Sequence, residues 1–340
     1  MLKDNIVLIG MPGVGKSTVG VILAKVLGYQ FIDAANVICF DENGEFDSEK
    51  TNEVCSEKLA ATENAVIPGF YGAMPNGKVK TFSRGGSDVT GSIVARAIKA
   101  DVYENWTDVS GCLICDPRIV NNPEPIKTIT YRELRELAYM GATVLHEDAI
   151  FPVRAAGIPV NIKNTNQPED RGTMIVSESA EHCDHIITGI AGKKGMSVIN
   201  IEKDKMNSEI GFGKNVLRAL EKSNVSFEHM PSGVDTMSVV IATEALAGKE
   251  TAIIDEIKSR VHPDQIYIES NLALIAVVGR GMKSARGTAA ILFSALADAR
   301  VNIKMIDQGS SELNIIVGVE EEDFEVAIKA IYKRFIGINQ

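Results

Sequence analysis

Two stretches in the last third of the chain repeat each other, and this repeat constrains the fold more than any other feature of the sequence. Ala219-Leu220, followed by Val225 and Gly233, recurs 76 residues later as Ala295-Leu296, followed by Val301 and Gly309. In both copies a helical pattern leads into a strand, a Gly/Ser turn and a second strand, over residues 237–242 and 313–319. A repeat of this length indicates two related modules of βαββ type at the C-terminal end.

The part of the chain before the repeat alternates short apolar runs with helical patterns. The predicted helices are residues 48–61, 89–100 and 131–141, and the predicted strands are residues 65–67, 102–106, 160–162 and 174–176. This alternation predicts an α/β layer. Residues 177–184 are polar and lack periodicity, so we place a domain boundary there. The expected domains are residues 1–28, 29–176, 185–268 and 269–340.

The charge balance argues against several classes of partner. The chain has 35 lysines and arginines against 45 aspartates and glutamates, a net charge of −10 and a pI of about 5.2. Because an acidic chain repels nucleic acid and anionic membranes, we expect neither as a partner, and we expect an anionic ligand to be held by a local pocket. The apolar runs are far shorter than the roughly 18 residues of a membrane-spanning helix. Five cysteines fit a reducing compartment, which favours a cytoplasmic location.

The first 28 residues contain a phosphate-loop motif. Gly10-Met-Pro-Gly13-Val-Gly15-Lys16-Ser17 matches G-x-x-x-x-G-K-[ST] between a predicted strand and a predicted helix that ends at Gly28. The glycines would let backbone N–H groups approach phosphate, Lys16 would reach the outer phosphates, and the Ser17 hydroxyl would bind Mg²⁺. Residues 1–33 resemble the opening of shikimate kinase, although that family has an aspartate where this chain has Ala35.

A second glycine-rich motif, Arg84-Gly85-Gly86-Ser87-Asp88, directly precedes an amphipathic helical pattern. Free N–H groups at the start of such a helix favour an anion. Arg84 can clamp a carboxylate through two parallel hydrogen bonds, and Asp88 can hold an ammonium group. These are the groups that an anionic amino-acid substrate requires.

Other polar segments are interpreted from their position in the predicted elements. Thr107-Asp108 falls at the end of a predicted strand, where open α/β sheets bind nucleotides. Cys112-Leu-Ile-Cys115 and residues 182–185, which read HCDH, lack a second ligand cluster, so we assign no metal site made of protein side chains.

From residue 29 to about residue 335 the sequence closely resembles aspartokinase, the amino-acid kinase that phosphorylates the β-carboxylate of L-aspartate. The resemblance rests on residues 66–72, 82–88, 106–111, 116–118, 137–146 and 306–312, which read VIPGFYG, FSRGGSD, WTDVSG, DPR, LAYMGATVLH and IDQGSSE. It implies that Arg84 and Asp88 contact aspartate, with Gly85, Gly86 and Ser87 between them. ATP and Mg²⁺ are the implied cofactors.

The resemblance also implies an ATP site lined by Thr107, Asp108, Asp116 and Arg118. Many members have a nucleotide-contacting lysine in the segment where this chain has Thr143. Members also begin with a Lys-Phe-Gly-Gly-Ser/Thr segment, whose lysine bridges the transferring phosphate, followed by a long further stretch of kinase sheet and helix. Because the phosphate-loop segment stands in that place, we expect a truncated amino-acid-kinase sandwich followed by two ferredoxin-like ACT domains.

The C-terminal modules are expected to bind an amino-acid effector. By resemblance they are ACT domains, which bind an end-product amino acid, usually lysine or threonine, at a dimer interface. Independently, backbone groups at a Gly/Ser bend together with carboxylates can hold both ends of a zwitterion. The two turns are residues 232–235 and 307–312, and the predicted effector residues are Ser226, Ser232, Asp235, Asp307, Gln308, Ser310, Ser311 and Glu312.

Three hypotheses for function follow. The first is an aspartate kinase that converts ATP and L-aspartate to 4-phospho-L-aspartate and ADP, regulated by an amino acid and dimeric through its ACT domains. The second is a catalytically inactive amino-acid-binding regulatory chain, or a chimeric reading frame. The third, a shikimate kinase, depends on the phosphate-loop motif alone.

Overall fold

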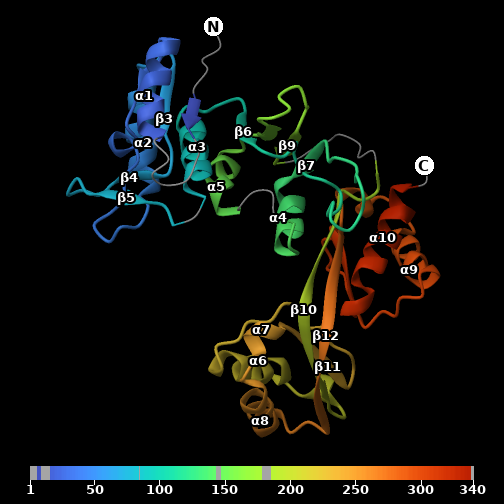
Figure 1. Ribbon diagram of the computed structural model, residues 1–340. Helices are drawn as coiled ribbons and strands as arrows, with labels where there is room; N and C mark the ends of the chain where they lie inside the picture. Colours follow the sequence, from blue (N-terminus) through green and yellow to red (C-terminus); the bar gives the residue numbers. More distant parts are fainter. Residues whose placement is uncertain (1–5, 9–15, 84, 143–146, 178–184, 338–340) are drawn as a thin grey trace. The chain divides into compact units, whose positions relative to one another are not determined.

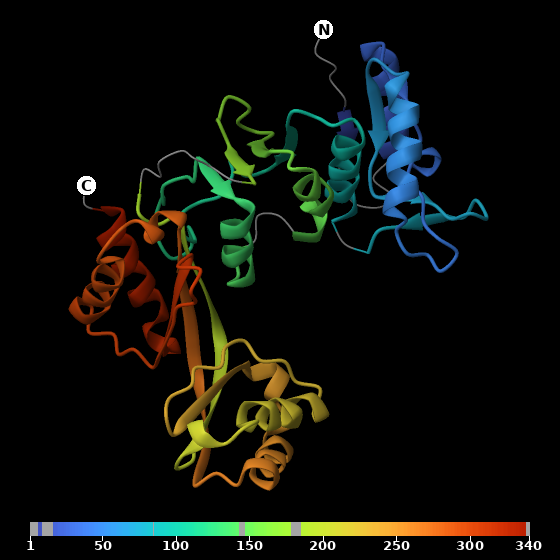
Figure 2. The same cartoon turned by 180° about the vertical axis from the view of Figure 1, so that it is seen from behind.

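The computed structural model describes residues 6–8, 16–83, 85–142, 147–177 and 185–337. The chain forms two compact units. The first consists of Met1–Cys112, Pro125–Ala138 and Thr143–Ala180, and the second of Leu113–Glu124, Tyr139–Ala142 and Glu181–Gln340. Figures 1 and 2 show the elements of both units from opposite sides.

A three-stranded parallel sheet lies at the N-terminal end of the first unit (Figure 1). Its order is β1-β3-β2, and its strands are β1 (Ile6–Leu8), β2 (Gln30–Phe31) and β3 (Ala65–Pro68). Helices α1 (Lys16–Leu27) and α2 (Ser48–Ala60) connect them, with a 3₁₀ turn at Ala34–Asn36. β3 is central and buried along its whole length, as a strand between two neighbours and under helices should be.

Helix α2 illustrates how the local sequence sets an element. The side chain of Asp47 accepts a hydrogen bond from the backbone N–H of Lys50 at 3.0 Å, which caps the helix. Thr51, Cys55 and Leu59 follow at four-residue spacing and are the buried residues of the helix. Cys55 and Leu59 join a hydrophobic core that also contains buried side chains of β3.

A second, four-stranded sheet completes the first unit, with the order β6-β8-β9-β7. Its strands are β6 (Tyr103–Thr107), β7 (Thr128–Thr130), β8 (Val160–Asn164) and β9 (Thr173–Val176). The helices are α3 (Gly86–Ala97), α4 (Tyr131–Tyr139) and α5 (Glu147–Ala156), and a hairpin is formed by β4 (Tyr71–Ala73) and β5 (Val79–Thr81). Helix α3 packs against α5, α2 and strand β6, so it lies between the two sheets of this unit.

Helix α4 begins with a buried capping box. The backbone N–H and the hydroxyl of Thr130 both donate to Glu133 Oε2, at 2.9 and 2.8 Å, and the N–H of Glu133 donates back to the Thr130 hydroxyl at 3.2 Å. These bonds satisfy donors that a helix start leaves free. They also explain why a glutamate can be fully buried there.

The second unit is built on one five-stranded antiparallel sheet with the order β11-β10-β12-β14-β13. The strands are β10 (Gly189–Glu202), β11 (Thr236–Ala242), β12 (Gln265–Val278), β13 (Met305–Asp307) and β14 (Asn314–Glu320). The helices are α6 (Phe212–Lys222), α7 (Thr243–Leu246), α8 (Glu250–Val261), α9 (Thr288–Asp298) and α10 (Phe324–Phe335). Three 3₁₀ turns lie at Met206–Ser208, Arg280–Lys283 and Glu321–Asp323.

The repeat seen in the sequence is present in this unit. Helices α6 and α9 begin 76 positions apart, at Phe212 and Thr288, and each is preceded by a glycine with φ of 86°. The left-handed φ explains why glycine stands at both positions. The two modules share their sheet: β10 and β12 are each 14 residues long and pair over both modules, with a register irregularity between Lys193 and Val198.

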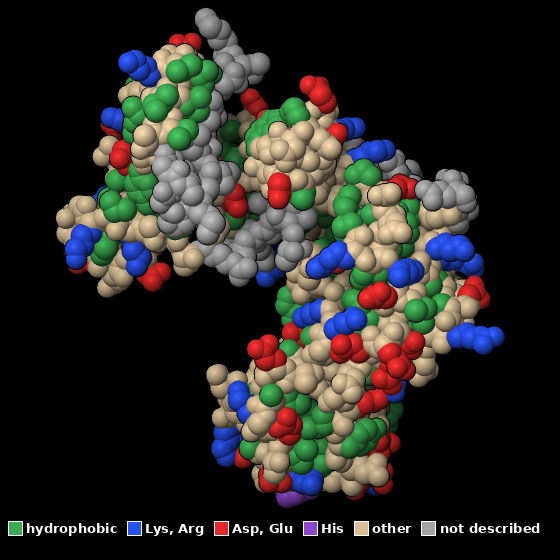
Figure 3. All heavy atoms as spheres, in the orientation of Figure 1, with side chains coloured by type: hydrophobic (Ala, Val, Ile, Leu, Met, Phe, Trp, Pro, Cys, Tyr) green, Lys and Arg blue, Asp and Glu red, His purple; other side chains and the backbone are tan. Residues whose placement is uncertain are grey.

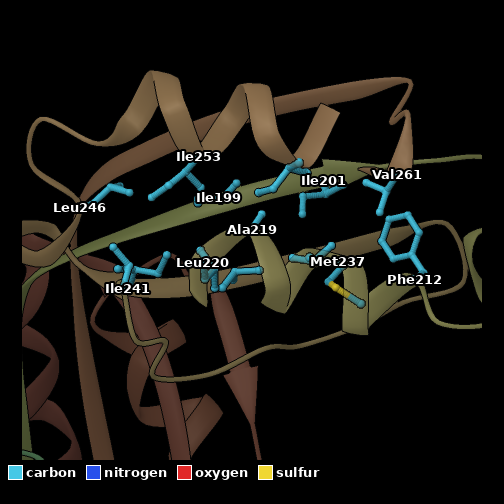
Figure 4. Packing of buried hydrophobic residues seen from close by; sticks show 14 of the residues in the cluster. Ile199, Ile201, Phe212, Ala219, Leu220, Met237, Ile241, Leu246, Ile253 and Val261 are labelled. Atoms are coloured by element: carbon cyan, nitrogen blue, oxygen red, sulfur yellow. The ribbon is translucent and has the colours of Figure 1, made fainter. Parts of the chain in front are cut away.

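The core of the α6–α8 module shows the alternation expected of a sheet with one covered face. Ile199 and Ile201 of β10 and Ile241 of β11 point toward the helices, where they meet Leu220 of α6 and Ile253 of α8 (Figure 4). All five side chains are at most 1% exposed. The intervening residues of the same strands lie on the opposite face.

Helix α1 spans Lys16–Leu27, and several of its apolar side chains are exposed. It ends at Leu27, before Gly28 with φ of 71°, as expected for a C-terminal glycine. However, Val19, Ile22 and Val26 are 53%, 59% and 76% exposed. Apolar side chains therefore gather on the outer face of this helix (Figure 3).

Candidate functional site

The glycine turn that precedes α3 has a conformation that explains its sequence. Gly85 has φ of 58° and ψ of 22°, in the left-handed region, and serves as the N-cap of the helix. A Cβ on Gly86 would lie 2.9 Å from both Phe70 Cδ2 and Phe82 Cβ, closer than real contacts allow. The sequence pattern placed the start of this helix at residue 89, but it begins at Gly86, so Ser87 and Asp88 are in its first turn. Arg84 lies outside the described residues.

The carboxylate of Asp88 is partly buried at this helix start. Its Oδ1 accepts a hydrogen bond from Asn105 Nδ2 of β6 at 3.1 Å. Burial raises the pKa of Asp88, and the Asn105 hydrogen bond offsets only part of that effect. The neighbouring Ser87 is buried. The first turn of α3 therefore presents one carboxylate whose position is set by a side chain of β6.

The predicted nucleotide residues Thr107 and Asp108 stand at the carboxyl end of β6. The carbonyl oxygen of Thr107 accepts hydrogen bonds from the N–H and the hydroxyl of Thr165, at 2.8 and 2.9 Å. The Thr107 hydroxyl donates to Asp108 Oδ1 at 3.2 Å, and Asp108 is exposed. Asn105, which is hydrogen-bonded to Asp88, is in the middle of β6, and Asp108 directly follows the last residue of the strand. One strand therefore connects Asp88 with the predicted nucleotide position.

The loop after β6 is anchored by a polar network. The Ser110 hydroxyl donates to Asp170 Oδ2 at 2.5 Å and accepts a hydrogen bond from Asn164 Nδ2 at 2.9 Å. A Cβ on Gly111 would lie 2.3 Å from Thr173 Oγ1, so this position requires glycine for close approach. These contacts give the exposed Asp108 a rigid support.

Two further predicted nucleotide residues, Asp116 and Arg118, belong to the second unit. The Arg118 guanidinium donates to both Asp116 oxygens, with its shortest bond of 2.6 Å from Nη2 to Oδ2. This hydrogen bonding lowers the pKa of Asp116 and raises the pKa of Arg118. Arg118 is exposed, and Thr143 lies outside the described residues.

The predicted phosphate loop falls mostly outside the described residues, which exclude Gly10, Gly13 and Gly15. Lys16 is the first residue of α1. The Ser17 hydroxyl is exposed and lies 3.5 Å from the Tyr71 hydroxyl, which in turn donates to Asp33 Oδ1 at 2.9 Å. The role of these residues in phosphate binding stays a prediction.

The predicted effector residues lie in the second unit, most of them in exposed turns and Asp307 at the end of β13. Asp235 is held by the backbone: its Oδ1 accepts from the N–H of Lys205, and its carbonyl accepts from the N–H of Lys203, both at 2.8 Å. Ser226, Ser232, Gln308, Ser310, Ser311 and Glu312 are exposed. Glu312 has φ of 52° and closes its turn by donating its N–H to the carbonyl of Gly309.

The structure adds His229, which the sequence analysis did not single out. Its Nδ1 lies 2.7 Å from Asp307 Oδ2. A residue just before the first predicted effector turn therefore contacts Asp307, the last residue of β13 and the first residue of the second predicted effector turn. His229 Nε2 is buried and has no hydrogen-bond partner. A lone histidine in a polar turn carries no sequence signal that would have predicted a contact 78 residues away.

A cavity of about 260 Å³ lies next to this contact, on the face of the five-stranded sheet opposite the α6–α8 core. Ile306 lines it, together with Asn200 and Ser238, which are hydrogen-bonded to each other at 2.8 Å. Lys304, also at the cavity, is paired with Glu269 at 2.5 Å. The cavity thus combines apolar walls with one cation and one carboxylate.

Among the residues that the structure describes, no three His, Cys, Asp or Glu side chains are grouped as metal ligands would be. Likewise, no described helix has both the length and the apolar character needed to cross a bilayer.

Comparison with known proteins identifies two families in the chain. The sequence model of the amino acid kinase family matches residues 12–164, and that of the ACT domain matches residues 275–335. Aspartokinase 3 of Bacillus subtilis is 45% identical over 271 residues, which cover 79% of this chain and 60% of that protein. The chain therefore spans three fifths of the length of that relative.

Two comparisons cover a larger share of the relative. Aspartokinase 2 of Bacillus subtilis is 30% identical over 286 residues, which cover 83% of this chain and 69% of that protein. The crystal structure of Clostridium acetobutylicum aspartate kinase superposes with a TM-score of 0.87 at 59% identity, covering 94% of this chain and 74% of that one.

These findings correct one interpretation of the sequence and establish another. The amino acid kinase match begins at residue 12, inside the segment that we compared with shikimate kinase. Neither the shikimate-kinase resemblance of residues 1–33 nor the expected truncation of the kinase sandwich is borne out. The fold of an amino-acid kinase followed by ACT modules is confirmed. With 69% of one relative covered at 30% identity and 74% of a solved structure at 59%, the chain belongs to the aspartokinase family.

Proposed function

We propose that this chain is an aspartate kinase, which transfers the γ-phosphate of ATP to the β-carboxylate of L-aspartate and forms 4-phospho-L-aspartate and ADP. The observation that carries the proposal is the partly buried Asp88 carboxylate, held by Asn105 in the first turn of α3. A fixed carboxylate at the start of a helix, where the helix dipole favours anions, suits a substrate that carries one ammonium group and two carboxylates. Membership of the aspartokinase family supports the same reaction.

The chemistry requires positioning and charge neutralisation and does not require a general base. The β-carboxylate of aspartate is already ionised at neutral pH, so it can attack the γ-phosphorus directly. The barrier arises from bringing two anions together, and preorganised donors lower it. In this proposal Asp88 holds the substrate ammonium group and Arg84 binds a substrate carboxylate. The substrate lies close to the backbone of Gly85, Gly86 and Ser87.

The nucleotide is proposed to bind at the carboxyl end of β6. Thr107 and Asp108 are placed there, on a loop supported by the Ser110 network. Asp116, Arg118 and Thr143 are proposed as further nucleotide contacts from the family resemblance. Mg²⁺ bound to nucleotide phosphates usually takes one or two protein carboxylates as ligands, and the exposed Asp108 would be such a ligand. Bound Mg²⁺ would neutralise phosphate charge.

Regulation by an amino acid at the ACT modules is the second part of the proposal. The two predicted effector turns are joined by the His229–Asp307 contact, beside a cavity that has a cation and a carboxylate in its wall. The cation, Lys304, and the carboxylate, Glu269, match the carboxylate and the ammonium group of an amino acid. Lysine or threonine is the proposed effector. The relative from Clostridium acetobutylicum is described as an allosteric enzyme. We further propose a homodimer formed through the ACT modules.

A coupled assay of ADP formation by the full chain tests the proposed reaction. We expect turnover that requires both ATP and L-aspartate and does not occur with shikimate. Asp88→Asn should raise the KM for aspartate by about 10- to 100-fold, because a hydrogen bond to a charged group contributes about 1.5–3 kcal/mol. Asp101→Asn, an exposed aspartate of the same unit, is the matched control and should change the KM less than twofold.

Two results would contradict the proposal. One is ADP formation that does not depend on aspartate. The other is an effector-induced rise in melting temperature, with lysine or threonine, from a chain that shows no turnover, which would favour an inactive regulatory chain.

A further inference from the structure

Asp88 belongs to a small polar network that joins α3 to β6. Asn105 Nδ2 donates to Asp88 Oδ1 at 3.1 Å and lies 3.0 Å from the Tyr103 hydroxyl, to which it also donates. The Tyr103 hydroxyl then donates to the backbone carbonyl of Asp88 at 3.3 Å. The amide of Asn105 therefore donates to two acceptors, the Asp88 carboxylate and the Tyr103 hydroxyl. The Tyr103 hydroxyl in turn donates to Asp88, so both contacts of the amide lead to the same residue of α3.

The network is enclosed by the protein. Asn105 is 3% exposed and Tyr103 is 7% exposed. Helix α3 comes close enough because residue 91 is glycine: a Cβ there would lie 2.5 Å from the Tyr103 hydroxyl oxygen. An amide buried in a strand costs free energy unless its hydrogen bonds are made. Here they are made to the carboxylate that the proposed reaction uses.

The position of Asn105 along β6 adds a second argument. Tyr103, Asn105 and Thr107 alternate with Glu104 and Trp106, and it is the polar Asn105 that is buried while Trp106 is 38% exposed. Burying an amide in preference to an indole is the reverse of the usual order. The hydrogen bond from Asn105 to Asp88 explains this reversal, because the buried face of β6 then binds Asp88 in addition to packing against α3.

We propose that Asn105 is a positioning residue of the aspartate site, which holds the Asp88 carboxylate in place for the substrate ammonium and keeps α3 in register with β6. This inference rests on the proposed function. Through β6 the same residue relates the aspartate position to Thr107 and Asp108, two and three residues further along the chain. Asn105 itself does not touch the reacting atoms.

The charge state of Asp88 provides a readout that packing alone would not move. Burial raises the pKa of Asp88, and the Asn105 hydrogen bond acts in the opposite direction. Among the described titratable groups, Tyr103 interacts with Asp88. Burial raises the pKa of Tyr103, and the nearby Asp88 carboxylate raises it further, so Tyr103 remains protonated. Removing the amide should therefore move the titration of Asp88 to higher pH.

The test compares Asn105→Leu with Tyr103→Phe in the full chain. Asn105→Leu removes the donor to Asp88 at similar volume, and we expect the KM for aspartate to rise about 10- to 100-fold with the KM for ATP within twofold. The acid limb of kcat/KM for aspartate should move to higher pH. Tyr103→Phe removes the bond to the Asp88 carbonyl and one acceptor of the amide but keeps the Asn105–Asp88 bond, so it should change the KM for aspartate and the acid limb clearly less than Asn105→Leu does.

A second variant and a second measurement keep the test decisive. If Asn105→Leu does not fold, Asn105→Thr retains a hydroxyl donor on a β-branched side chain suited to a strand, and should show a smaller shift in the same direction. Carbon-13 NMR of the Asp88 carboxyl, assigned with Asp88→Asn, follows its titration without any need for turnover. A higher midpoint in the Asn105 variant supports the inference.

The two proposals fail in different ways. Absence of aspartate-dependent ADP formation by the unmodified chain contradicts the proposed function, and the NMR titration then still decides the role of Asn105. Normal turnover by the unmodified chain, with an unchanged KM and an unchanged acid limb in the Asn105 variant, overturns the positioning role alone.

Discussion

The ion pair between Lys193 and Glu228 allows a sharp test of how burial determines the strength of a charge contact. Lys193 Nζ of β10 lies 2.6 Å from Glu228 Oε2, and the two side chains are 22% and 15% exposed. Lys193 Nζ also lies 4.4 Å from the centre of the Tyr139 ring. Tyr139 is the last residue of α4 and belongs, with this pair, to the second unit.

Lys193→Met should destabilise the second unit by about 2 kcal/mol. Exposed pairs contribute about 0–1 kcal/mol, and breaking a fully buried pair costs about 3–5 kcal/mol. A pair that retains a fifth of its exposure should fall between these values. For a unit of this size, about 2 kcal/mol corresponds to a drop in Tm of about 4–8 °C, which differential scanning calorimetry resolves.

The matched control is Lys222→Met. Lys222 Nζ also lies 2.6 Å from a glutamate, Glu256, but the Lys222 side chain is 65% exposed. The two substitutions are the same and the two distances are equal. The control lysine is more exposed, and Glu256 keeps a second cation, Arg260, at 2.6 Å, so the loss of Lys222 leaves no unpaired, partly buried carboxylate. We expect a clearly smaller drop in Tm for the control. Equal drops for both variants would refute the reasoning that burial sets the magnitude.

The pH dependence gives an independent check with a definite sign. Burial alone would raise the pKa of Glu228, but hydrogen bonds from Lys193 and Tyr139 outweigh it, and the net shift is downward. A carboxyl whose folded pKa is lowered stabilises the protein above its unfolded pKa, about 4.3, and this contribution is lost as the pH falls through the folded pKa. The Tm difference between the unmodified chain and Lys193→Met should be full at pH 7 and shrink below about pH 4. A difference that widens on acidification would contradict the assignment.

Three further substitutions test the packing. Gly72→Ala would put a Cβ 2.4 Å from the carbonyl oxygen of Ile38, so a loss of about 3 kcal/mol or more is expected in calorimetry of the first unit, and an unchanged Tm would be inconsistent with this close approach. Leu220→Ala, at 1% exposure in the α6–α8 core, should lower the free energy of unfolding of the second unit by about 2–5 kcal/mol in urea titrations; a loss below about 1 kcal/mol would mean that the core is not packed as described. Glu133→Ala removes the acceptor of two Thr130 donors and should cost about 1–3 kcal/mol, and a neutral result would argue against the capping box.

Local patterns in the sequence predicted local structure well. The helix expected over residues 48–61 is α2 at Ser48–Ala60, and the α1 helix ends before Gly28 as its position suggested. The 76-residue repeat predicted two modules whose first helices, α6 and α9, start at equivalent positions. These features follow from periodicity, caps and glycine conformation, which are properties of short segments.

Features that depend on long-range pairing could not be predicted in the same way. The repeat did not show that β10 and β12 run through both modules, because strand pairing is not encoded in the spacing of apolar residues. The strand predicted over residues 102–106 did not reveal that the structure buries Asn105 against Asp88 and leaves Trp106 38% exposed. The His229–Asp307 contact likewise joins two turns that look independent in the sequence.

The site itself was predicted in part. The interpretation of Asp88 as a substrate-binding carboxylate followed from its place after two glycines, and the structure puts it in the first turn of α3. The amide that holds it lies on another element and was not predicted. The expectation that a separate phosphate-loop fragment replaces part of the kinase domain was wrong, because the amino acid kinase match already begins at residue 12, inside that short motif.

Trapping of the product with hydroxylamine tests the central claim most directly. An acyl phosphate reacts with hydroxylamine to give a hydroxamate, whereas a phosphate ester does not. With ATP, Mg²⁺ and L-aspartate, the full chain should form aspartyl hydroxamate in step with ADP, and Asp88→Asn should form far less at the same aspartate concentration. ADP released without hydroxamate would show that the phosphate does not reach a carboxylate, and would contradict the account.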